Sequence, residues 1–283
     1  MAELHDLTAL EQGAALRRGE VSAAELVEHY RGRADRLDRE VGAYISRTDA
    51  VAERQARAVA DRLAAADPAE SLGPLFGTVV PVKDLNAFAG VRMTLGSAAV
   101  ELVPTADDDV AARMRAGGLV MPGKTNTPEF GLPCYTENAV APPARTPWDP
   151  TRSAGGSSGG AAAAVAAGMV SAAQGSDGGG SIRIPASVTG LVGVKPSRGR
   201  VGNGPLPEAV GELAVQGVLA RMVRDAAALL DVLIGDASRG ELLTAAGRDP
   251  GRLRIGRYAV PVIADAVVDP AVLAGYERTA VVL

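Results

Sequence analysis

The sequence predicts an α/β fold that is preceded by an N-terminal helical arm. Residues 1–70 are rich in alanine and charge and carry two helix-start signals. From residue 71 onward, β-branched apolar runs alternate with amphipathic stretches, which is typical of strands alternating with helices. An apolar fraction of 47% over 283 residues is ample for a core. We therefore expect one domain, 1–283, made of the arm 1–70 and an α/β core 71–283.

The arm is expected to contain three helices. "TALE" from Thr8 and "SAAE" from Ser22 both match the capping-box pattern, and each precedes an amphipathic run. Alanine and charge dominate residues 50–67, which is consistent with a third helix. We interpret this arm as a solvated scaffold rather than as a site.

The first half of the core is expected to supply two strands and a helix. "PLFGTVVPVKDLNAFAG" (74–90) is apolar and β-branched, which predicts a buried strand leading into a loop. "DDDVAARMRAGG" (107–118) predicts a helix with an acidic first turn and a glycine stop. "LVMPG" (119–123) predicts a second short strand.

The second half continues the alternation. "AAAAVAAGM" (161–169) predicts a helix of small residues that can pack closely, and "TGLVGVKPS" (189–197) predicts a third strand. "VRDAAALLDVLIG" (223–235) predicts an amphipathic helix that ends at Gly235. "RLRIGRY" (252–258) is interpreted as the start of another strand.

Composition and charge argue against several classes of partner. The net charge of −4 disfavours nucleic acid, because phosphate binding requires a basic surface. No run of about 18 apolar residues is present, so we expect no membrane span, and no signal-peptide pattern opens the chain. Cys134 is the single cysteine. It cannot form an intrachain disulfide, which is consistent with a reducing cytoplasm.

The residue inventory also limits the chemistry. The two histidines, His5 and His29, both lie in the arm. A Ser-His-Asp triad around a serine in the core is therefore disfavoured, and histidine-ligated zinc lacks ligands. We expect neither a metal nor a cofactor. If a serine is the nucleophile, its base is a lysine whose pKa is lowered by burial or by a neighbouring cation.

One phosphate-binding motif is rejected. "GLVMPGKT" (118–125) matches the P-loop pattern, but a true P-loop follows a strand and opens a helix. Here a helix precedes Gly118, "LVMP" is itself strand-like, and Pro128 disfavours a helix continuing from Thr125.

The glycine-rich stretch around Ser181 says more about function than this motif does. "DGGGSIRIP" (177–185) places three glycines directly before Ser181. Successive glycines let backbone N–H groups turn toward one point, forming a nest that suits a phosphate or an oxyanion. Pro185 is compatible with a short helix that starts near Ser181. Glycine clusters alone more commonly mark tight turns, so this stretch by itself leaves catalysis open.

Several segments together resemble the amidase signature family of serine hydrolases. "GGSSGG" (155–160) and "GSDGGGSIRIPA" (175–186) carry the resemblance, and Ser181 follows Ser157 by 24 positions (181 − 157). "GTVVPVKD", "MPGKTNTPEFG", "KPSRGRV" and "VQGVLARMVRDAAALLDVL" are also similar to family segments. The resemblance covers nearly the whole chain. It implies a mixed β-sheet flanked by helices.

The resemblance also implies the site. It makes Ser181 the nucleophile, Ser157 the bridging serine after a cis peptide bond, and Lys83 the base. It further implies that the Ser157 hydroxyl contacts both Lys83 and Ser181. The oxyanion hole would consist of the backbone N–H groups of Gly178, Gly179, Gly180 and Ser181. Ser158 is expected to support the site, Asp177 and Arg183 to orient the loop, and Cys134 to pack near the pocket.

The implied activity is hydrolysis of a small-molecule carboxamide to a carboxylate plus ammonia or an amine, without a cofactor. A homodimer is compatible with the sequence. One alternative is the glutamine-using component of a tRNA-dependent amidotransferase, which typically has Gln at the position of Ile184. Another is a non-catalytic remnant.

The sequence departs from the family pattern at two places. Thr146 stands where the family often has Asn, and the chain stops at Leu283 in an expected helix. The chain therefore resembles an amidase that lacks its C-terminal part.

Overall fold

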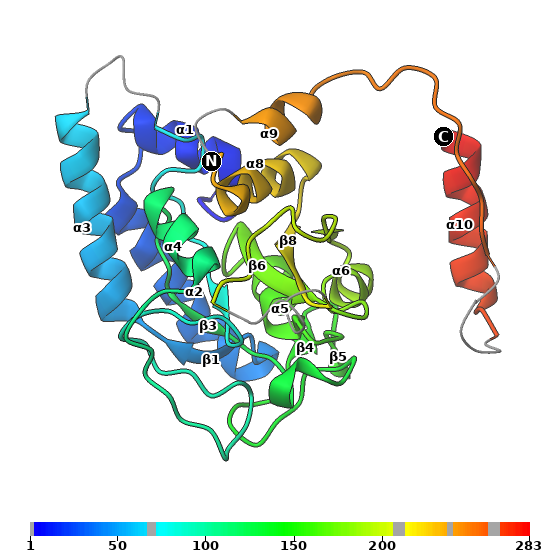
Figure 1. Cartoon of the computed structure of the whole chain (residues 1–283), viewed down its shortest axis with the longest axis horizontal. Coiled ribbons are helices and arrows are strands. Elements are labelled where there is room, and N and C mark those ends of the chain that lie inside the picture. Colours follow the sequence, from blue (N-terminus) through cyan, green and yellow to red (C-terminus); the bar gives the residue numbers. More distant parts are fainter. Residues whose placement is uncertain (1–2, 67–71, 206–212, 237–239, 260–266) are drawn as a thin grey trace. The chain divides into compact units, whose positions relative to one another are not determined.

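The computed structural model describes most of the chain and divides it into two compact units. The units are Met1–Gly247 and Arg248–Leu283, and each is described by itself. The boundary that the sequence predicts between arm and core, at residues 70 and 71, lies outside the described residues. The described residues are 3–66, 72–205, 213–236, 240–259 and 267–283 (Figure 1).

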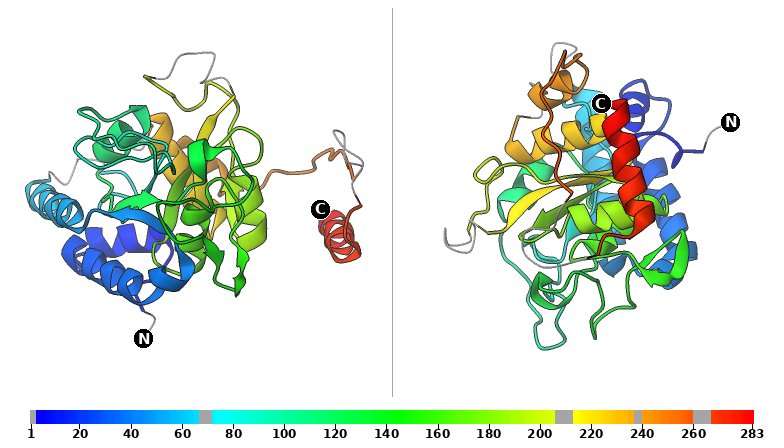
Figure 2. Two further views of the ribbon diagram at one scale, coloured as in Figure 1. Left: turned by 90° about the horizontal axis from the view of Figure 1, so that it is seen from below. Right: turned by 90° about the vertical axis from the view of Figure 1, so that its right-hand side faces the viewer.

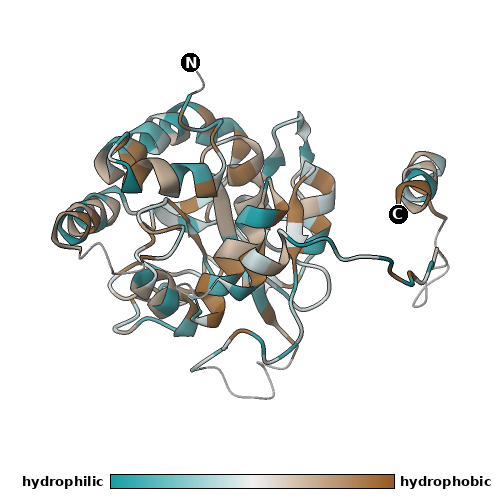
Figure 3. Ribbon diagram, turned by 90° about the horizontal axis from the view of Figure 1, so that it is seen from above, coloured by the Kyte–Doolittle hydropathy of each residue, from teal (hydrophilic) through white to brown (hydrophobic). Residues whose placement is uncertain are grey.

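The N-terminal helices form where the sequence places them. Helix α1 (Ala9–Arg17) and helix α2 (Ala23–Val41) begin at complete capping boxes, with Thr8 and Ser22 as the N-caps, as predicted. Helix α3 (Asp49–Ala65) confirms the third helix and packs against α2. Figure 2 shows these helices side by side. In Figure 3 hydrophilic and hydrophobic residues share the same helices, as expected for amphipathic elements.

A small mixed sheet follows, in the strand order β1-β3-β2. Strand β1 (Tyr44–Arg47) is antiparallel to β3 (Gly123–Thr125), and β2 (Val82–Lys83) is parallel to β3. The stretch 74–90 does contain a buried strand that leads into a loop, but the strand is short, because regular pairing is confined to β2 and one bridge between Val79 and Val120. The strand expected at "LVMPG" is displaced into "GKT", since only its last residue, Gly123, belongs to β3.

A second sheet is wholly antiparallel, in the order β6-β8-β7. Its strands are β6 (Ala172–Asp177), β7 (Val192–Val194) and β8 (Val215–Ala220). Strand β7 confirms the strand expected in "TGLVGVKPS". Strands β4 (Arg145–Thr146) and β5 (Asp149–Ser153) form a separate antiparallel pair.

Helices surround these sheets. Helix α5 (Gly159–Ala166) is the predicted small-residue helix, and every residue from Gly159 to Val165 is buried. Its alanines belong to the larger apolar core. Helix α8 (Val223–Ile234) ends at left-handed Gly235 as predicted, and it packs with α4 in a second apolar cluster. The remaining elements of this unit are α4 (Asp109–Ala116), η1 (Glu129–Gly131), α6 (Arg183–Thr189) and α9 (Glu241–Ala245).

The second unit contains one helix among its described residues, α10 (Pro270–Val282), which Asp269 caps. The strand expected at "RLRIGRY" is wrong. Residues 252–258 form no regular structure. They are exposed, and a strand needs a ladder partner that this stretch does not find. Instead, Arg257 pairs with Glu277, and the Tyr258 backbone N–H donates to the Tyr276 hydroxyl at 2.8 Å.

Over the described residues, no helix combines the length and the apolar character that crossing a bilayer requires.

A buried carboxylate ties the arm to the core, and this contact is testable. Asp225 of α8 accepts hydrogen bonds from the backbone N–H groups of Ala9 and Leu10, both at 3.1 Å. We expect Asp225→Ala to lower the free energy of unfolding by about 1–3 kcal/mol, because two buried donors at the start of α1 lose their acceptor. Denaturant unfolding measures this loss. Asp61→Ala, at an exposed position of α3, is the matched control.

Candidate active site

Lys83 lies at the centre of the site. It ends strand β2 and is completely buried. Its Nζ atom lies 2.8 Å from the Ser157 hydroxyl and 3.2 Å from the Ser176 hydroxyl. The Ser176 carbonyl oxygen is 3.5 Å away. The structure therefore brings together two of the three sequence-predicted catalytic side chains, and it surrounds the amine with oxygen atoms.

Strand β6 holds Lys83 in place through a side chain. The Lys83 backbone N–H donates to Gln174 Oε1 at 2.8 Å, so an amide side chain replaces a ladder partner. The Gln174 amide nitrogen in turn donates to Asn86 Oδ1 at 3.1 Å and to Gln216 Oε1 at 2.8 Å. Gln174 and Ser176 are two residues apart on β6, so both side chains face β2. This network fixes the end of β2.

Burial changes the protonation of the lysine. Desolvation lowers the pKa of Lys83 from its ordinary value of 10.5 to about 7, while the negative charge of Asp177 acts weakly in the opposite direction. A buried ammonium is costly unless a carboxylate pairs with it directly, and the close partners of Nζ are neutral oxygens. The amine is therefore available as a base near neutral pH.

The first glycine-rich segment, residues 155–160, packs closely against the backbone of another segment. The peptide bond between Gly156 and Ser157 is cis, which confirms the prediction. A Cβ atom on Gly156 would lie 2.7 Å from backbone atoms of Tyr135, so only glycine fits beneath that chain. Ser158 supports the site as expected, because its hydroxyl donates to the Ser176 carbonyl oxygen at 3.2 Å.

The two glycine-rich segments are joined through backbone. The N–H of Ser158 donates to the carbonyl oxygen of Ser181 at 3.0 Å. This bond places the proposed nucleophile beside the segment that bears Ser157. The expected contact between the Ser157 and Ser181 hydroxyls is not among the hydrogen bonds of the described residues. The structure thus links the segments without closing the whole predicted relay.

Asp177 organises the second glycine-rich segment. Its carboxylate accepts from Arg183 Nε at 2.9 Å and from the backbone N–H of Gly180 at 2.6 Å and of Ile182 at 3.2 Å. Burial alone would raise the pKa of Asp177, but these donors lower it to about 2, so the carboxylate stays charged. Asp177 and Arg183 therefore orient the loop, as the sequence suggests.

The Asp177 carboxylate also reduces the number of N–H groups available for the candidate oxyanion hole. The N–H of Gly180 is already used by Asp177, so it is not free for a substrate oxygen. The N–H groups of Gly178, Gly179 and Ser181 make no hydrogen bond to described residues, and Gly178 and Gly179 are exposed. Gly180 itself has φ 128°, a conformation that favours glycine. An exposed pair of glycines before Ser181 is a suitable anion cradle.

The other lysine of the sheet has different neighbours. In the parallel pairing of β2 with β3, Val82 is opposite Lys124 and Lys83 is opposite Thr125, so the two lysines face opposite sides. Lys124 Nζ contacts Asp84 Oδ1 at 3.4 Å and donates to the Asn86 carbonyl oxygen. A lysine buried in this way cannot cradle a nucleotide phosphate, which supports rejecting the P-loop.

Sequence reasoning missed two residues and misplaced one. Gln174 and Ser176 contact Lys83 but were not predicted. The sequence could have indicated them. Gln174 and Ser176 occupy alternate positions of the segment that leads into the glycines before Ser181, so in a strand both side chains lie on one face. Cys134 is exposed, so its interpretation as a packing residue is wrong. It lies in a bend after η1, where its side chain is open to solvent.

Comparison with known proteins identifies the family. The family model described as Amidase matches residues 25–283. This chain belongs to the Amidase family.

Curated relatives agree with that membership. The Synechocystis sp. protein named "Putative amidase" is 42% identical over 261 residues, which cover 88% of this chain and 51% of that protein. A Streptomyces coelicolor relative, a component of glutamyl-tRNA(Gln) amidotransferase, is 40% identical, over 83% of this chain and 47% of that protein. This Amidase-family chain therefore spans about half the length of the curated relatives it matches.

Solved structures agree as well. One, described as an amidase, has a TM-score of 0.73 and 37% identity, over 81% of this chain and 52% of that chain. Another is 6-aminohexanoate cyclic dimer hydrolase complexed with substrate. It has a TM-score of 0.73 and 36% identity, over 91% of this chain and 50% of that chain. The α/β fold predicted from the sequence is thereby confirmed as that of amidase-signature enzymes.

The buried amine makes stability depend on pH. Between about pH 7 and 10.5 the unfolded chain binds a proton at Lys83 that the folded chain does not, so the stability that Lys83 contributes rises with pH in this window. We expect Lys83→Met to stabilise the fold most at pH 7 and below, where the folded state must bury an ammonium. The advantage should shrink toward pH 10.5.

Chemical denaturation of the parent and the variant across this pH range measures the difference. Arg57→Met, at an exposed position of α3, is the control. An advantage for Lys83→Met that is constant with pH would contradict the lowered pKa.

Proposed function

We propose that this chain carries the catalytic centre of an amidase that hydrolyses a carboxamide to a carboxylate plus ammonia or an amine. In this proposal Ser181 is the nucleophile, Ser157 the bridging serine and Lys83 the base. The observation that carries it is the 2.8 Å contact between a fully buried lysine amine and the Ser157 hydroxyl. Family membership supports the reaction class.

The proton steps follow from the contacts of the amine. A neutral amine has two hydrogens and one lone pair. Nζ can donate its hydrogens to the oxygen atoms of Ser176, which leaves the lone pair for the Ser157 hydroxyl. Lys83 then takes the Ser157 proton while Ser157 takes the Ser181 proton, which makes Ser181 Oγ nucleophilic. In the substrate-bound state this requires the hydroxyls of Ser157 and Ser181 to meet, since catalytic hydrogen bonds commonly tighten on binding.

The remaining steps use the glycine loop. Ser181 Oγ forms a bond to the amide carbon, and the carbonyl π electrons move to oxygen. The backbone N–H groups of Gly178, Gly179 and Ser181 stabilise the resulting oxyanion. The proton held by Lys83 returns through Ser157 to the leaving nitrogen as the C–N bond breaks. Water then attacks the acyl-enzyme by the same route, which releases the carboxylate and restores Ser181.

The glutamine-using component of an amidotransferase is the second candidate, because one such protein is 40% identical to this chain. Ile184 argues against it, since that subfamily typically has Gln there. In this structure Ile184 lies against Gly180, where a Cβ would come within 2.7 Å of Ile184 Cδ1. An apolar residue in the first turn of α6, against Gly180 of the oxyanion loop, favours an apolar amide over glutamine. Ammonia release from glutamine, but not from aliphatic, aryl or peptide amides, would reverse this preference.

Labelling tests the nucleophile directly. We expect a fluorophosphonate probe to modify Ser181 and Ser181→Ala to remove both labelling and at least about 10³-fold of amide turnover. Ser187→Ala, on the neighbouring helix α6 and exposed, should retain both. Mass spectrometry locates the label. A parent protein that is folded but is not labelled would favour the non-catalytic remnant.

The base is tested by the pH dependence of kcat/KM. We expect the rate to rise with pH along a limb with an apparent pKa of about 7, because Lys83 must lose its proton before it can act. Lys83→Ala should abolish that limb and reduce the rate about 10²–10⁴-fold. If the limb persists in Lys83→Ala, another group is the base.

A further inference from the structure

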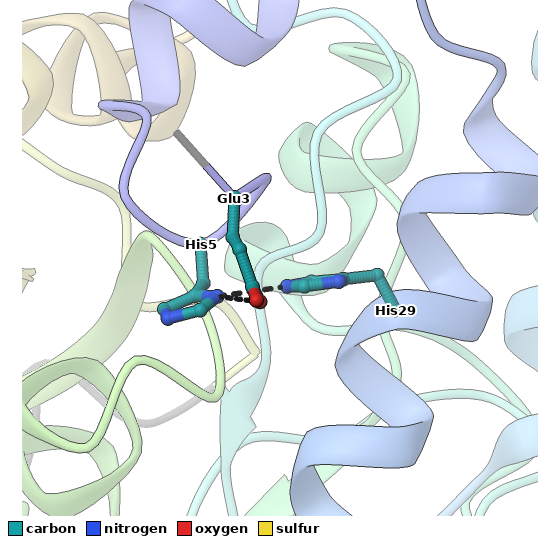
Figure 4. Close-up of side chains that lie close together, drawn as sticks. All are labelled: Glu3, His5 and His29. Carbon is teal, nitrogen blue, oxygen red and sulfur yellow. Dashed lines mark hydrogen bonds and ion pairs between the residues drawn. The ribbon is translucent and has the colours of Figure 1, made fainter. Parts of the chain in front are cut away.

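The only two histidines of the chain lie next to each other, far from the glycine-rich segments in sequence. His5 Nδ1 is 3.1 Å from His29 Nε2, although 24 positions separate the residues. A carboxylate oxygen of Glu3 is 3.4 Å from the same His5 nitrogen. Figure 4 shows the three side chains converging from the N-terminal segment and from helix α2. One ligand atom from each residue lies within 4.8 Å of the others.

The two imidazoles meet nitrogen to nitrogen rather than face to face. Their planes are inclined by only 17°, but the ring centroids are 5.2 Å apart. Together with the short distance between nitrogens, this separation places the rings edge to edge, as Figure 4 also shows. Such an arrangement aims a lone pair of each ring at the same point, which is also where Glu3 ends.

The spacing of the ligand atoms fits a small divalent metal ion. At Zn–N and Zn–O distances of 2.0–2.2 Å, neighbouring ligand atoms of a tetrahedral site are about 3.3–3.5 Å apart. The separations of His5 Nδ1 from His29 Nε2 and from the Glu3 carboxylate, 3.1 and 3.4 Å, are close to that edge length. Two imidazoles with one carboxylate form a ligand set that zinc uses when a further position is left to water.

The surroundings supply orientation and access. Asp6 contacts both neighbouring ligands. Its Oδ1 is 3.7 Å from His5 Nε2, so the carboxylate faces the imidazole. Its Oδ2 accepts a hydrogen bond from the Glu3 backbone N–H at 3.0 Å, which fixes the turn that carries Glu3. A carboxylate on the far nitrogen is a common companion of a metal-binding histidine. The Glu3 side chain is largely exposed, which leaves a route for an ion. Arg33 acts on both histidines as an opposing charge, and Arg221 and Arg36 each act on one of them. Arg33 is bound to the carbonyl oxygens of Ala167 and Gly168.

We propose that Glu3, His5 and His29 form a binding site for a divalent transition metal, with Zn²⁺ the preferred ion and water in the remaining position. The metal links the N-terminal segment to helix α2. It also fixes His5 where its ring approaches Gly168, at the end of the buried helix α5, since a Cβ on Gly168 would lie 3.3 Å from His5 Cδ2. The sequence had led us to expect no metal, because two histidines and one cysteine are too few ligands by themselves. The proposal does not depend on amide hydrolysis.

The test uses the tag-free chain, because a histidine tag would bind the same ions. Co²⁺ is titrated first, and its visible absorption reports the coordination geometry. Zn²⁺ affinity is then measured by competition with a chromophoric chelator. We expect one ion per chain, a tetrahedral Co²⁺ spectrum, and a melting temperature that rises with Zn²⁺.

Variants separate this site from adventitious surface binding. We expect His29→Gln and Glu3→Gln each to weaken Zn²⁺ binding more than about 10-fold, because even outer-shell partners of ligands contribute 10–100-fold. Glu40→Gln, an exposed acid at the end of α2, removes the same charge and should leave the affinity unchanged. Glu3 is largely exposed, so its variant keeps the fold even if His29→Gln does not. The absence of Co²⁺ or Zn²⁺ binding by the parent chain, or equal affinity in all variants, would leave only a histidine–histidine hydrogen bond and overturn the proposal.

Discussion

The removal of the Lys83 amine from water is the constraint on which the rest of the site depends. A lysine with no exposed surface is stable only if hydrogen-bonding atoms replace its hydration and its charge is lost or balanced. Here the replacements are two serine hydroxyls and a carbonyl oxygen, all on segments other than β2. The lysine thereby fixes where strand β6 and the first glycine-rich segment must lie. Its basicity is a consequence of the same burial.

Glycine makes this arrangement geometrically possible. A Cβ on Gly155 would lie 3.0 Å from Pro185 Cα, and one on Gly160 would lie 2.3 Å from the backbone nitrogen of Asn126. Backbone therefore packs on backbone on both sides of Ser157, with no room for side chains. In the second segment the glycines have another use, because Gly178 and Gly179 are exposed and their N–H groups make no hydrogen bond to the residues that the structure describes. The two glycine-rich segments serve different purposes, close approach in the first and an anion cradle in the second.

Local signals predicted the helices well and the strands less well. Capping boxes at Thr8 and Ser22 and the left-handed glycine after α8 depend on a few neighbouring residues, so the sequence specifies them directly. The strands of the mixed sheet are two to four residues long, and their limits depend on which distant segment supplies hydrogen bonds. The role of Gln174 illustrates this, because its contact with the Lys83 backbone joins residues 91 positions apart. Likewise, the hydrogen bond from the Gly180 N–H to Asp177 depends on the conformation of the folded loop, so no sequence motif predicts it.

The bond from the Ser158 N–H to the Ser181 carbonyl oxygen has a consequence for mutational scanning. Because both partners are main-chain atoms, replacing the buried Ser158 with alanine preserves the bond, and the variant would register only the loss of a hydroxyl. Proline, or an ester in place of the amide, would sever it. A side-chain scan can thus overlook the bond that holds the two glycine-rich segments in register, and its importance would be visible only when the backbone itself is changed.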